Sequence, residues 1–517
     1  MKTRVAAWLV GICVAASAAA QDKPAEKPPE KTEKPAAEAP KKEPPRAEQS
    51  VTQHTAVIGG VPVAYTATAG TLIVKNGKDE PWASMGYTAY VRKDAGPAAK
   101  RPIAFCYNGG PGSSSIWLHM GALGPRRVVV ADGGPTPPPP YQVVDNAYSP
   151  LDKTDVVLID PVGTGFSKPL GEFKDKDFWG VDPDIESVSR FIMQYVSDNG
   201  RWNSPKYLIG ESYGTTRSAG VVNWLQSNGG MSFNGVVLVS VAMDLGAIFA
   251  LPGNDRPYPF FLPSYAATAA FHKAVPAPAD LKAWLAEVEQ YASGEYAAAL
   301  AEGARLSDDR RAAVVKKLHD YTGLSEEYLR LANLRVTETE FAQQLERQKG
   351  LTIGRLDSRF AGPTMDPLAK ETEDDPQSNA ISGAYTAAFL DWLHDGLKFG
   401  EGRTYTVICD AFLSWDFKHK VPGLPFPSPT LTDTGIDLGR AMLFNTNLRV
   451  LALNGLYDLA TPFYATEYQV AHVSPRADVQ SRIEMRYYPA GHMMYVAEPS
   501  LKAMKADIAD LIAKTSK

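Results

Sequence analysis

The chain has 517 residues, of which 44% are hydrophobic and 21% are charged, and its formal net charge is −5. A chain of this length and composition can bury a large core, and two structural units fit it better than one. The negative balance and the lack of a basic stripe argue against nucleic acid as a partner.

The first 20 residues are typical of a secretory signal peptide. Lys2 and Arg4 precede an apolar run over residues 5–14, and small residues occupy positions 17–20. This pattern predicts cleavage before Gln21 and a secreted or periplasmic protein. The apolar run is too short to cross a bilayer, so we expect no transmembrane anchor.

Residues 21–50 have the composition of a tether. They contain seven prolines, seven lysines or arginines and seven acidic residues, and no aromatic residue. Such a segment cannot bury enough apolar surface to offset chain entropy, so we predict a disordered, extended spacer. Order is expected to begin near Thr52.

Residues 51–245 are predicted to form the first part of an α/β core. Apolar and polar residues alternate over residues 55–93, and glycines mark the turns, so we predict hairpins there. Buried strands are expected at 103–107 and 156–160, and the first runs into a glycine-rich loop whose backbone must approach another group closely. A helix is predicted with Asp182 as its N-cap, Pro183 in its first turn and Asn199-Gly200 as its end. Strands that alternate with helices indicate a mostly parallel sheet covered on both faces.

A Gly-x-Ser-x-Gly pattern at Gly210, Ser212 and Gly214 follows the strand-like residues 207–209. The pattern alone is common by chance. Here, however, a helix-like segment follows and ends at an Asn-Gly-Gly stop, and another apolar strand comes next. This context is that of a nucleophile elbow, in which a sharp strand-to-helix turn exposes one serine. We therefore predict Ser212 as a nucleophile.

From residue 246 to 430 the strand–helix alternation disappears and helical patterns dominate. Thr337 and Glu340, for example, predict a capping box. We predict that this block is a largely helical cap inserted into the core, although a structural excursion with no role at the site explains much of it equally well. Residues 431–517 are expected to complete the core with strands at 449–453 and 484–488 and a final amphipathic helix.

A serine hydroxyl needs a base, and that base needs an orienting acid. Asp458 and His492 follow the two C-terminal strands, in the order serine, acid, histidine. Each has an ordinary alternative explanation, since Asp458 could cap a helix and a lone histidine is often a surface or core residue. Order and position together predict a Ser212–His492–Asp458 triad. The oxyanion hole is expected to use the backbone N–H groups of Gly110 and Tyr213.

Four motifs resemble the signature blocks of the serine carboxypeptidases, in the same order as in that family. They lie at residues 108–112, 160–167, 210–214 and 491–493. The resemblance implies an α/β-hydrolase fold: a mostly parallel central sheet flanked by helices, with the helical cap inserted. It also implies removal of single residues from the C-termini of peptides, with Asn108 and Glu211 binding the terminal carboxylate.

A physical reason exists for Glu211 to bind a substrate carboxylate. A carboxyl and a carboxylate at close range share a proton below the pKa of the pair, which favours acidic conditions. Glu211 could instead be an ordinary buried acid with no contact to substrate.

The chain departs from the family pattern at four positions. Ala122 stands where a further glutamate is usual, Cys106 replaces a tryptophan and Leu456 replaces a frequent acid. Ser113 replaces a cysteine, so the corresponding family disulfide cannot form. Cys106 and Cys409 could pair with each other or be two buried thiols. The triad and the oxyanion loop are intact, so catalysis is better supported than exopeptidase specificity.

These observations predict a serine carboxypeptidase that acts through an acyl-enzyme on peptides with a free C-terminus. An esterase or acyltransferase with the same triad is the alternative, and a non-catalytic binding protein is a third possibility. No clustered His/Cys pattern indicates a metal or an organic cofactor. The sequence does not predict an oligomeric state.

Overall fold

The structure is a computed structural model that describes residues 45–428 and 430–516. The predicted signal peptide and residues 21–44 of the predicted tether lie outside the described residues. Order begins earlier than expected, because the first strand, β1, starts at Gln49 rather than near Thr52. The residues from Pro45 onward form one unit.

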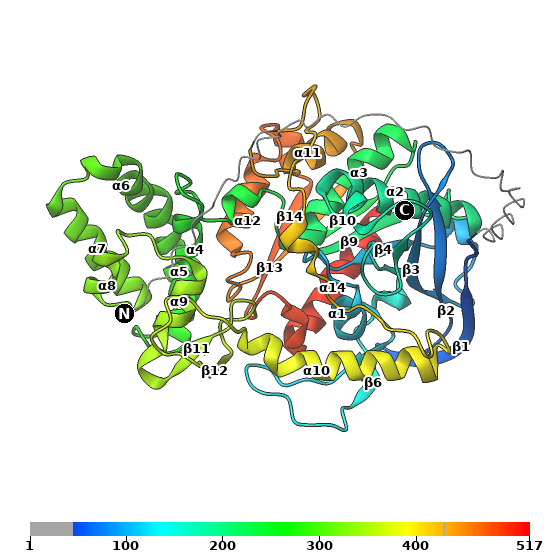
Figure 1. Cartoon of the computed structure of the whole chain (residues 1–517), viewed down its shortest axis with the longest axis horizontal. Coiled ribbons are helices and arrows are strands. Elements are labelled where there is room, and N and C mark those ends of the chain that lie inside the picture. The colour runs from blue at the N-terminus through cyan, green and yellow to red at the C-terminus, as the bar shows by residue number, and fades with distance from the viewer. Residues whose placement is uncertain (1–44, 429, 517) are drawn as a thin grey trace, which may run out of the picture. The chain divides into compact units, whose positions relative to one another are not determined.

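A ten-stranded sheet runs through this unit in the order β1-β2-β3-β7-β4-β9-β10-β13-β14, with β8 paired to β3 (Figure 1). The predicted hairpins form the antiparallel strands β1 to β3. From β7 to β14 every neighbouring pair is parallel, as the strand–helix alternation predicts. The strands are β1 (Gln49–Ile58), β2 (Val61–Lys75), β3 (Pro81–Arg92), β4 (Ile103–Tyr107), β7 (Asp155–Ile159), β8 (Lys168–Pro169), β9 (Lys206–Ser212), β10 (Gly235–Val241), β13 (Arg449–Gly455) and β14 (Ile483–Tyr488).

Both faces of the sheet are buried. In the central strand β4, Ile103, Phe105 and Tyr107 join one hydrophobic cluster, whereas Ala104 and Cys106 join another. This division follows from the two-residue period of a strand, which sends successive side chains to opposite faces. It also explains why β4 reads as a continuous apolar run.

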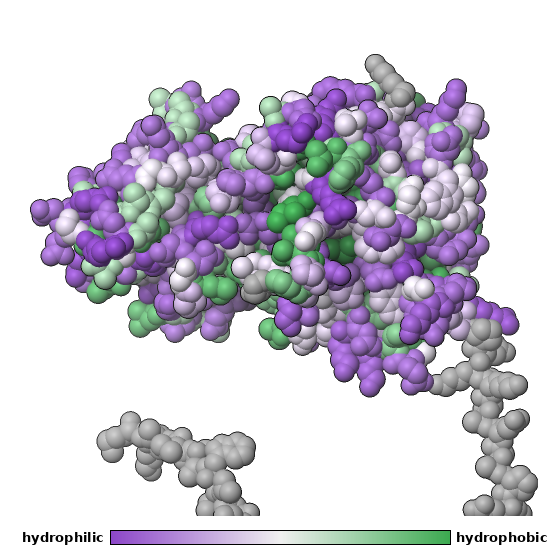
Figure 2. Space-filling model, turned by 90° about the horizontal axis from the view of Figure 1, so that it is seen from above, coloured by the Kyte–Doolittle hydropathy of each residue, from purple (hydrophilic) through white to green (hydrophobic). Residues whose placement is uncertain are grey.

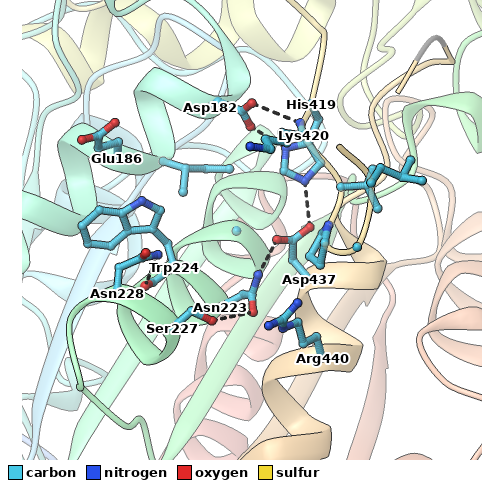
Figure 3. A pocket seen from close by; sticks show the side chains of 16 residues that line it. Asp182, Glu186, Asn223, Trp224, Ser227, Asn228, His419, Lys420, Asp437 and Arg440 are labelled. Carbon is cyan, nitrogen blue, oxygen red and sulfur yellow. Dashed lines mark hydrogen bonds and ion pairs between the residues drawn. The ribbon is translucent and has the colours of Figure 1, made fainter. Parts of the chain in front are cut away.

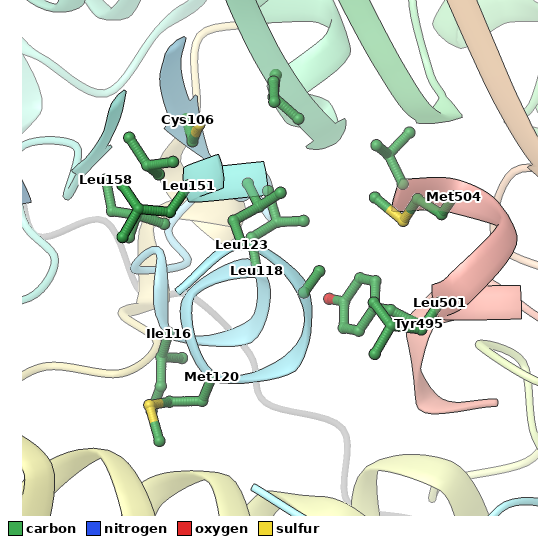
Figure 4. Close-up of a cluster of buried hydrophobic side chains, with 14 of the residues drawn as sticks. Cys106, Ile116, Leu118, Met120, Leu123, Leu151, Leu158, Tyr495, Leu501 and Met504 are labelled. Atoms are coloured by element: carbon green, nitrogen blue, oxygen red, sulfur yellow. The ribbon is translucent and has the colours of Figure 1, made fainter. Parts of the chain in front are cut away.

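Helices cover each face. The first cluster receives side chains from α2 (Val181–Asp198), α3 (Tyr213–Asn228) and α11 (Gly435–Phe444). The second receives them from α1 (Ile116–Leu118), α10 (Pro376–Asp391) and α14 (Glu498–Thr515). Figure 4 shows part of the second cluster, where Cys106 and Leu118 lie on the same side of the sheet as Leu501 and Met504 of the predicted final helix.

The insertion between β10 and β13 divides into two parts with different packing. Its first part has a hydrophobic cluster that draws on all six of its helices, and Figure 1 shows these helices gathered beyond β13 and β14. The predicted capping box of α9 is confirmed, because the backbone N–H groups of Thr337 and Glu340 each donate to the other's side chain. The helices are α4 (Pro257–Phe271), α5 (Leu281–Tyr291), α6 (Ala297–Glu302), α7 (Asp308–Thr322), α8 (Glu326–Leu331) and α9 (Glu338–Leu345).

The second part of the insertion belongs to the core rather than to the cap. A small antiparallel pair, β11 (Leu351–Ile353) with β12 (Ala361–Pro363), leads into α10. Apolar residues of α10, such as Tyr385 and Phe389, join the cluster on the sheet. The predicted cap over 246–430 is therefore only partly a separate helical body. The helical pattern of α10 indicates a helix but not which cluster its apolar side chains join.

The start of α2 also differs from the prediction. The helix begins at Val181 with Gly180 as its N-cap, so Asp182 lies inside the first turn. Its carboxylate is instead bound to His419. The remaining elements are β5 (Arg126–Val128), paired with β6 (Val143–Asp145), α12 (Phe463–His472) and α13 (Ala477–Gln480). None of the described helices is long and apolar enough to cross a membrane.

Candidate active site

Ser212 lies at the sharp turn between β9 and α3. Its backbone adopts φ +60° and ψ −130°, a conformation that is unusual for a residue with a side chain. The flanking glycines permit the turn: a Cβ at Gly210 would lie 2.2 Å from the carbonyl oxygen of Gly214. The strand–turn–helix context predicted for the elbow is therefore present.

Asp458 and His492 meet because β13 and β14 are parallel neighbours whose carboxyl ends share one edge of the sheet. Nδ1 of His492 lies 2.8 Å from Oδ2 of the fully buried Asp458. Because a carboxylate only accepts, Nδ1 carries the proton of this bond, which leaves Nε2 free of it. The backbone N–H groups of Ala460 and Thr461 donate to the other carboxylate oxygen, at 2.7 and 2.9 Å.

Two opposing effects act on the pKa of His492. Burial lowers it, and so does the charge of Arg355 to a smaller extent, but the charge of Asp458, the hydrogen bond to that carboxylate and the charge of Glu211 together raise it above its ordinary value. The carboxylate of Asp458 therefore stabilises the imidazolium that forms when Nε2 of His492 takes up a proton.

The predicted oxyanion loop packs directly on the elbow. A Cβ at Gly109 would lie 2.4 Å from the backbone nitrogen of Tyr213, so only glycine allows this approach. The next residue, Gly110, has φ +103°. Gly110, Ser212, Tyr213 and His492 line one cavity of about 270 Å³.

Asn108 and Glu211 form a buried pair. Nδ2 of Asn108 donates to Oε1 of Glu211 at 2.7 Å, while Oδ1 of Asn108 accepts from the backbone N–H of Leu118 at 3.0 Å. The other Glu211 oxygen, Oε2, has no hydrogen-bond partner among the described residues, and neither has the hydroxyl of Tyr495. Burial raises the pKa of Glu211 to about 7, against the opposing effects of the charge of His492 and the hydrogen bond from Asn108.

Ser212 lies where two cavities meet. The one already described, the aromatic cavity, has an apolar wall of Leu245, Ile248, Phe249, Phe412 and Phe417. The other, the amide cavity, also has about 270 Å³ and contains Asn108 and Glu211. Five residues line both cavities: Gly110, Ser212, Arg355, Leu356 and His492. A substrate bound across Ser212 would place different groups in the two cavities.

The surface near the site is partly apolar. Figure 2 shows hydrophobic residues gathered in and around a hollow on one face of the described unit. The stretch 408–426 contributes exposed Ile408, Phe412, Leu413, Leu424 and Phe426. Of these, Phe412 lines the aromatic cavity and Ile408 the amide cavity.

One segment of the site was not predicted from the sequence. The loop between β11 and β12 lies against the loops that carry Asp458 and His492. The carbonyl of Leu356 accepts from the backbone N–H of His492 at 2.6 Å. The carboxylate of Asp357 accepts from the backbone N–H of Gly491 at 3.1 Å. The carbonyl of Arg355 accepts from the N–H of Leu459 at 3.0 Å. These contacts join residues more than a hundred positions apart, and no local pattern signals them.

None of the four positions that depart from the family pattern is hydrogen-bonded to a residue of the predicted triad. Cys106 and Cys409 are both free, which answers the question the sequence left open. Ser113 accepts a hydrogen bond from the indole of Trp117 at 3.0 Å. Ala122 is buried beside Gly121, where a Cβ would meet the ring of Tyr495 at 2.5 Å.

A third cavity, of about 350 Å³, is larger but holds none of the predicted site residues (Figure 3). Its main feature is His419, whose Nδ1 lies 2.6 Å from Asp182 and whose Nε2 lies 2.8 Å from Asp437. Burial lowers the pKa of His419, but the two carboxylates outweigh burial and raise it to about 9. This clasp ties α2 and α11 to the loop that carries His419. Within the described ranges no group of three or more His, Cys, Asp or Glu residues is arranged to hold a metal ion.

Comparison with known proteins supports the resemblance found in the motifs. Residues 77–224 match the Peptidase S10 family, described as serine carboxypeptidase. No curated protein matches the sequence. Among solved structures, Kex1, a prohormone-processing carboxypeptidase from Saccharomyces cerevisiae, has a TM-score of 0.54 at 15% identity, covering 87% of this chain and 91% of that chain. A proline iminopeptidase from Mycobacterium smegmatis scores 0.37 at 15% identity over 86% and 98%, and we draw nothing from that lower score.

The predicted α/β-hydrolase fold is confirmed by the parallel sheet with flanking helices and by the likeness to Kex1. That likeness concerns the fold. Residues 77–224 are thus similar to the serine carboxypeptidase family, and the chain shares the fold of Kex1.

Proposed function

We propose that this serine hydrolase is a carboxypeptidase that releases the C-terminal residue of peptides through an acyl-enzyme. One observation carries the proposal: Ser212 lies between two cavities, and the buried Asn108–Glu211 pair lines one of them. In the proposal, the amide cavity holds the last residue of the peptide, and the aromatic cavity holds the side chain on the acyl side of the cleaved bond.

The proposed chemistry follows from the bonding around Ser212. Ser212 attacks the carbonyl carbon of the last peptide bond while Nε2 of His492 takes its proton. Asp458 holds the imidazole through Nδ1 at 2.8 Å and stabilises the imidazolium. The N–H groups of Gly110 and Tyr213 stabilise the tetrahedral oxyanion, a contribution of about 3–4 kcal/mol for a good donor. His492 then protonates the leaving amine as the peptide bond breaks. Water next attacks the acyl carbon while His492 takes its proton, and the return of that proton to Oγ of Ser212 breaks the ester bond and releases the shortened peptide acid.

Recognition of the free C-terminus is assigned to Asn108 and Glu211. With a pKa of about 7, Glu211 carries a proton at mildly acidic pH and can donate from it to the substrate carboxylate. Above pH 7 the ionised Glu211 would repel the substrate, so peptide turnover should decline on that side.

The apolar wall of the aromatic cavity is also compatible with an esterase or acyltransferase, since it would accept many acyl groups. The two functions differ in their need for a free carboxylate. A secreted or periplasmic location remains part of the proposal, and N-terminal sequencing of the mature protein tests it.

The test compares a blocked dipeptide with its C-terminal amide from pH 4 to 8, using purified wild type and a Ser212→Ala control. Release of the terminal amino acid by wild type only, with a clear preference for the free acid, supports a carboxypeptidase. Equal rates on the acid and the amide would remove the carboxylate-binding role. Cleavage of simple esters without any release from peptides would favour the esterase.

A further inference from the structure

One permanently charged side chain, that of Arg355, lies where the aromatic and amide cavities meet. Arg355, in the loop between β11 and β12, lines both cavities, and it is the only arginine or lysine among the residues that line either of them. Ser212 and His492 line the same junction. A substrate that spans the two cavities must therefore pass beside this guanidinium.

The backbone of Arg355 is held firmly while its side chain is free. Its N–H donates to the carboxylate of Asp375 at 2.7 Å, and its carbonyl accepts from Leu459 at 3.0 Å. Its half-buried guanidinium makes no hydrogen bond or ion pair with any described residue. Arg359 shows the contrast, because its guanidinium is paired with Asp357 and Asp132 at 2.6 and 2.8 Å. The loop thus positions Arg355 without using its charge.

The charges around Arg355 leave room for an added anion. Glu338 is the one acidic residue that lines the aromatic cavity, and it makes no ion pair with Arg355. Burial raises the pKa of Glu338, and the charge of Arg355 acts against that rise. In the amide cavity, one N–H of Asn108 is used by Glu211 and its oxygen is used by Leu118. Asn108 therefore has only its second N–H left to donate to a bound carboxylate.

We propose that the guanidinium of Arg355 binds the terminal carboxylate of the substrate in the amide cavity, beside Asn108 and Glu211. A guanidinium matches a carboxylate with two parallel N–H donors and stays charged at every relevant pH. Without it, a substrate carboxylate would be desolvated next to Glu211 with no compensating cation. This inference rests on the proposed carboxypeptidase function and deepens it, since it names the group that recognises the free C-terminus when Glu211 is ionised.

Glu211 and Arg355 are thus expected to bind the substrate carboxylate over different pH ranges. Glu211 contributes to carboxylate binding only while it carries a proton, whereas Arg355 contributes at all pH values of interest. The free-acid preference should therefore persist at neutral pH, and there it should depend on Arg355 more than it does at acidic pH.

The experiment uses the full chain with Arg355→Gln and Arg355→Lys, and Arg305→Gln as a control at an exposed position of the cap. The substrates are a blocked dipeptide with a free C-terminus, a blocked amino-acid ester that has no carboxylate, and an amidated peptide that ends in glutamate. Kinetics are measured at pH 5.5 and 7.5, and labelling of Ser212 by a fluorophosphonate checks that each variant is folded.

We expect Arg355→Gln to lower kcat/KM on the free acid by about 10- to 100-fold at pH 7.5, mainly through KM, as for loss of a charge-assisted hydrogen bond. The loss should be smaller at pH 5.5, and Arg355→Lys should recover part of it. Ester hydrolysis should lose clearly less than free-acid hydrolysis at each pH, because the charge of Arg355 also acts on His492 but the ester has no carboxylate to bind. Arg305→Gln should behave as wild type.

Three results would overturn the inference: an unchanged KM for the free acid, equal losses on the acid and the ester, or a loss confined to the amidated peptide with the glutamate side chain. The last result would mean that Arg355 binds a carboxylate on a side chain of the substrate rather than its terminal carboxylate. Failure of the proposed function is a separate outcome, because wild type would then label with the fluorophosphonate and cleave the ester without releasing an amino acid from the dipeptide.

Discussion

Replacing Glu211 with glutamine tests both the buried charge and its role at the site. Burial raises the pKa of Glu211 to about 7 from an ordinary value of 4.5, so the folded protein prefers the protonated side chain. Ionisation of Glu211 therefore destabilises the fold, and this cost accumulates between pH 4.5 and 7 and is constant above that range. At 1.36 kcal/mol per pKa unit, the cost at pH 8 is about 3 kcal/mol.

Glu211→Gln keeps the shape of the side chain and removes its charge. We expect the variant to be more stable than wild type by up to about 3 kcal/mol at pH 8, and to show no such gain at pH 4, where wild-type Glu211 is protonated in both states. Glutamine also cannot ionise above pH 7, so the decline in peptide turnover on the alkaline side should be weaker. Because the charge of Glu211 raises the pKa of His492, its removal should move the acidic limb of the profile to lower pH.

The assay combines urea denaturation at pH 4 and 8 with kcat/KM on a blocked dipeptide from pH 4 to 9. Glu401→Gln, an exposed glutamate without a hydrogen bond or ion pair, serves as the matched control and should leave both measurements unchanged. Equal effects of Glu211→Gln on stability at the two pH values would refute the buried-charge argument. An unchanged pH profile on peptides would refute the role in carboxylate binding.

Three further predictions concern the triad, the oxyanion loop and the clasp. Asp458→Asn should lower kcat on peptides by about 10⁴-fold with little change in fold, because the amide cannot hold the same tautomer of His492, and circular dichroism with steady-state kinetics measures both. Gly109→Ala should displace the loop from Tyr213, since its Cβ would lie 2.4 Å from that nitrogen, and slow fluorophosphonate labelling by about 10²-fold or more. Wild-type labelling rates in this variant would contradict the packing. His419→Gln should destabilise most below pH 6.5 and least above pH 9, because the raised pKa of about 9 means that the clasp stabilises the protonated imidazole. A pH-independent difference in Tm between pH 6 and 10 would rule this out.

The sequence by itself determined the parts of the site whose signals are local. The Gly-x-Ser-x-Gly turn with its strand and helix locates Ser212, and the ends of two apolar strands locate Asp458 and His492. Because neighbouring parallel strands end at one edge of a sheet, strand order alone was enough to expect these residues together. The capping box at Thr337 is local in the same way, since its two partners are three residues apart.

Only the tertiary structure decided the parts that depend on distant contacts. The helix α10 joins the core because its apolar residues belong to the cluster that also contains residues of α1 and α14. Asp182 lies inside the first turn of α2, where its carboxylate binds His419, 237 residues away. The loop that carries Arg355 reaches the loops of Asp458 and His492 mainly by backbone hydrogen bonds, and its one side-chain contact joins Asp357 to Gly491, 134 residues away, so no local pattern in the sequence signals it. The high pKa of Glu211 likewise comes from burial by many segments together. Spacing along the chain reports which residues share a turn, a strand or a helix face, but desolvation and long-range hydrogen bonds depend on how those elements pack.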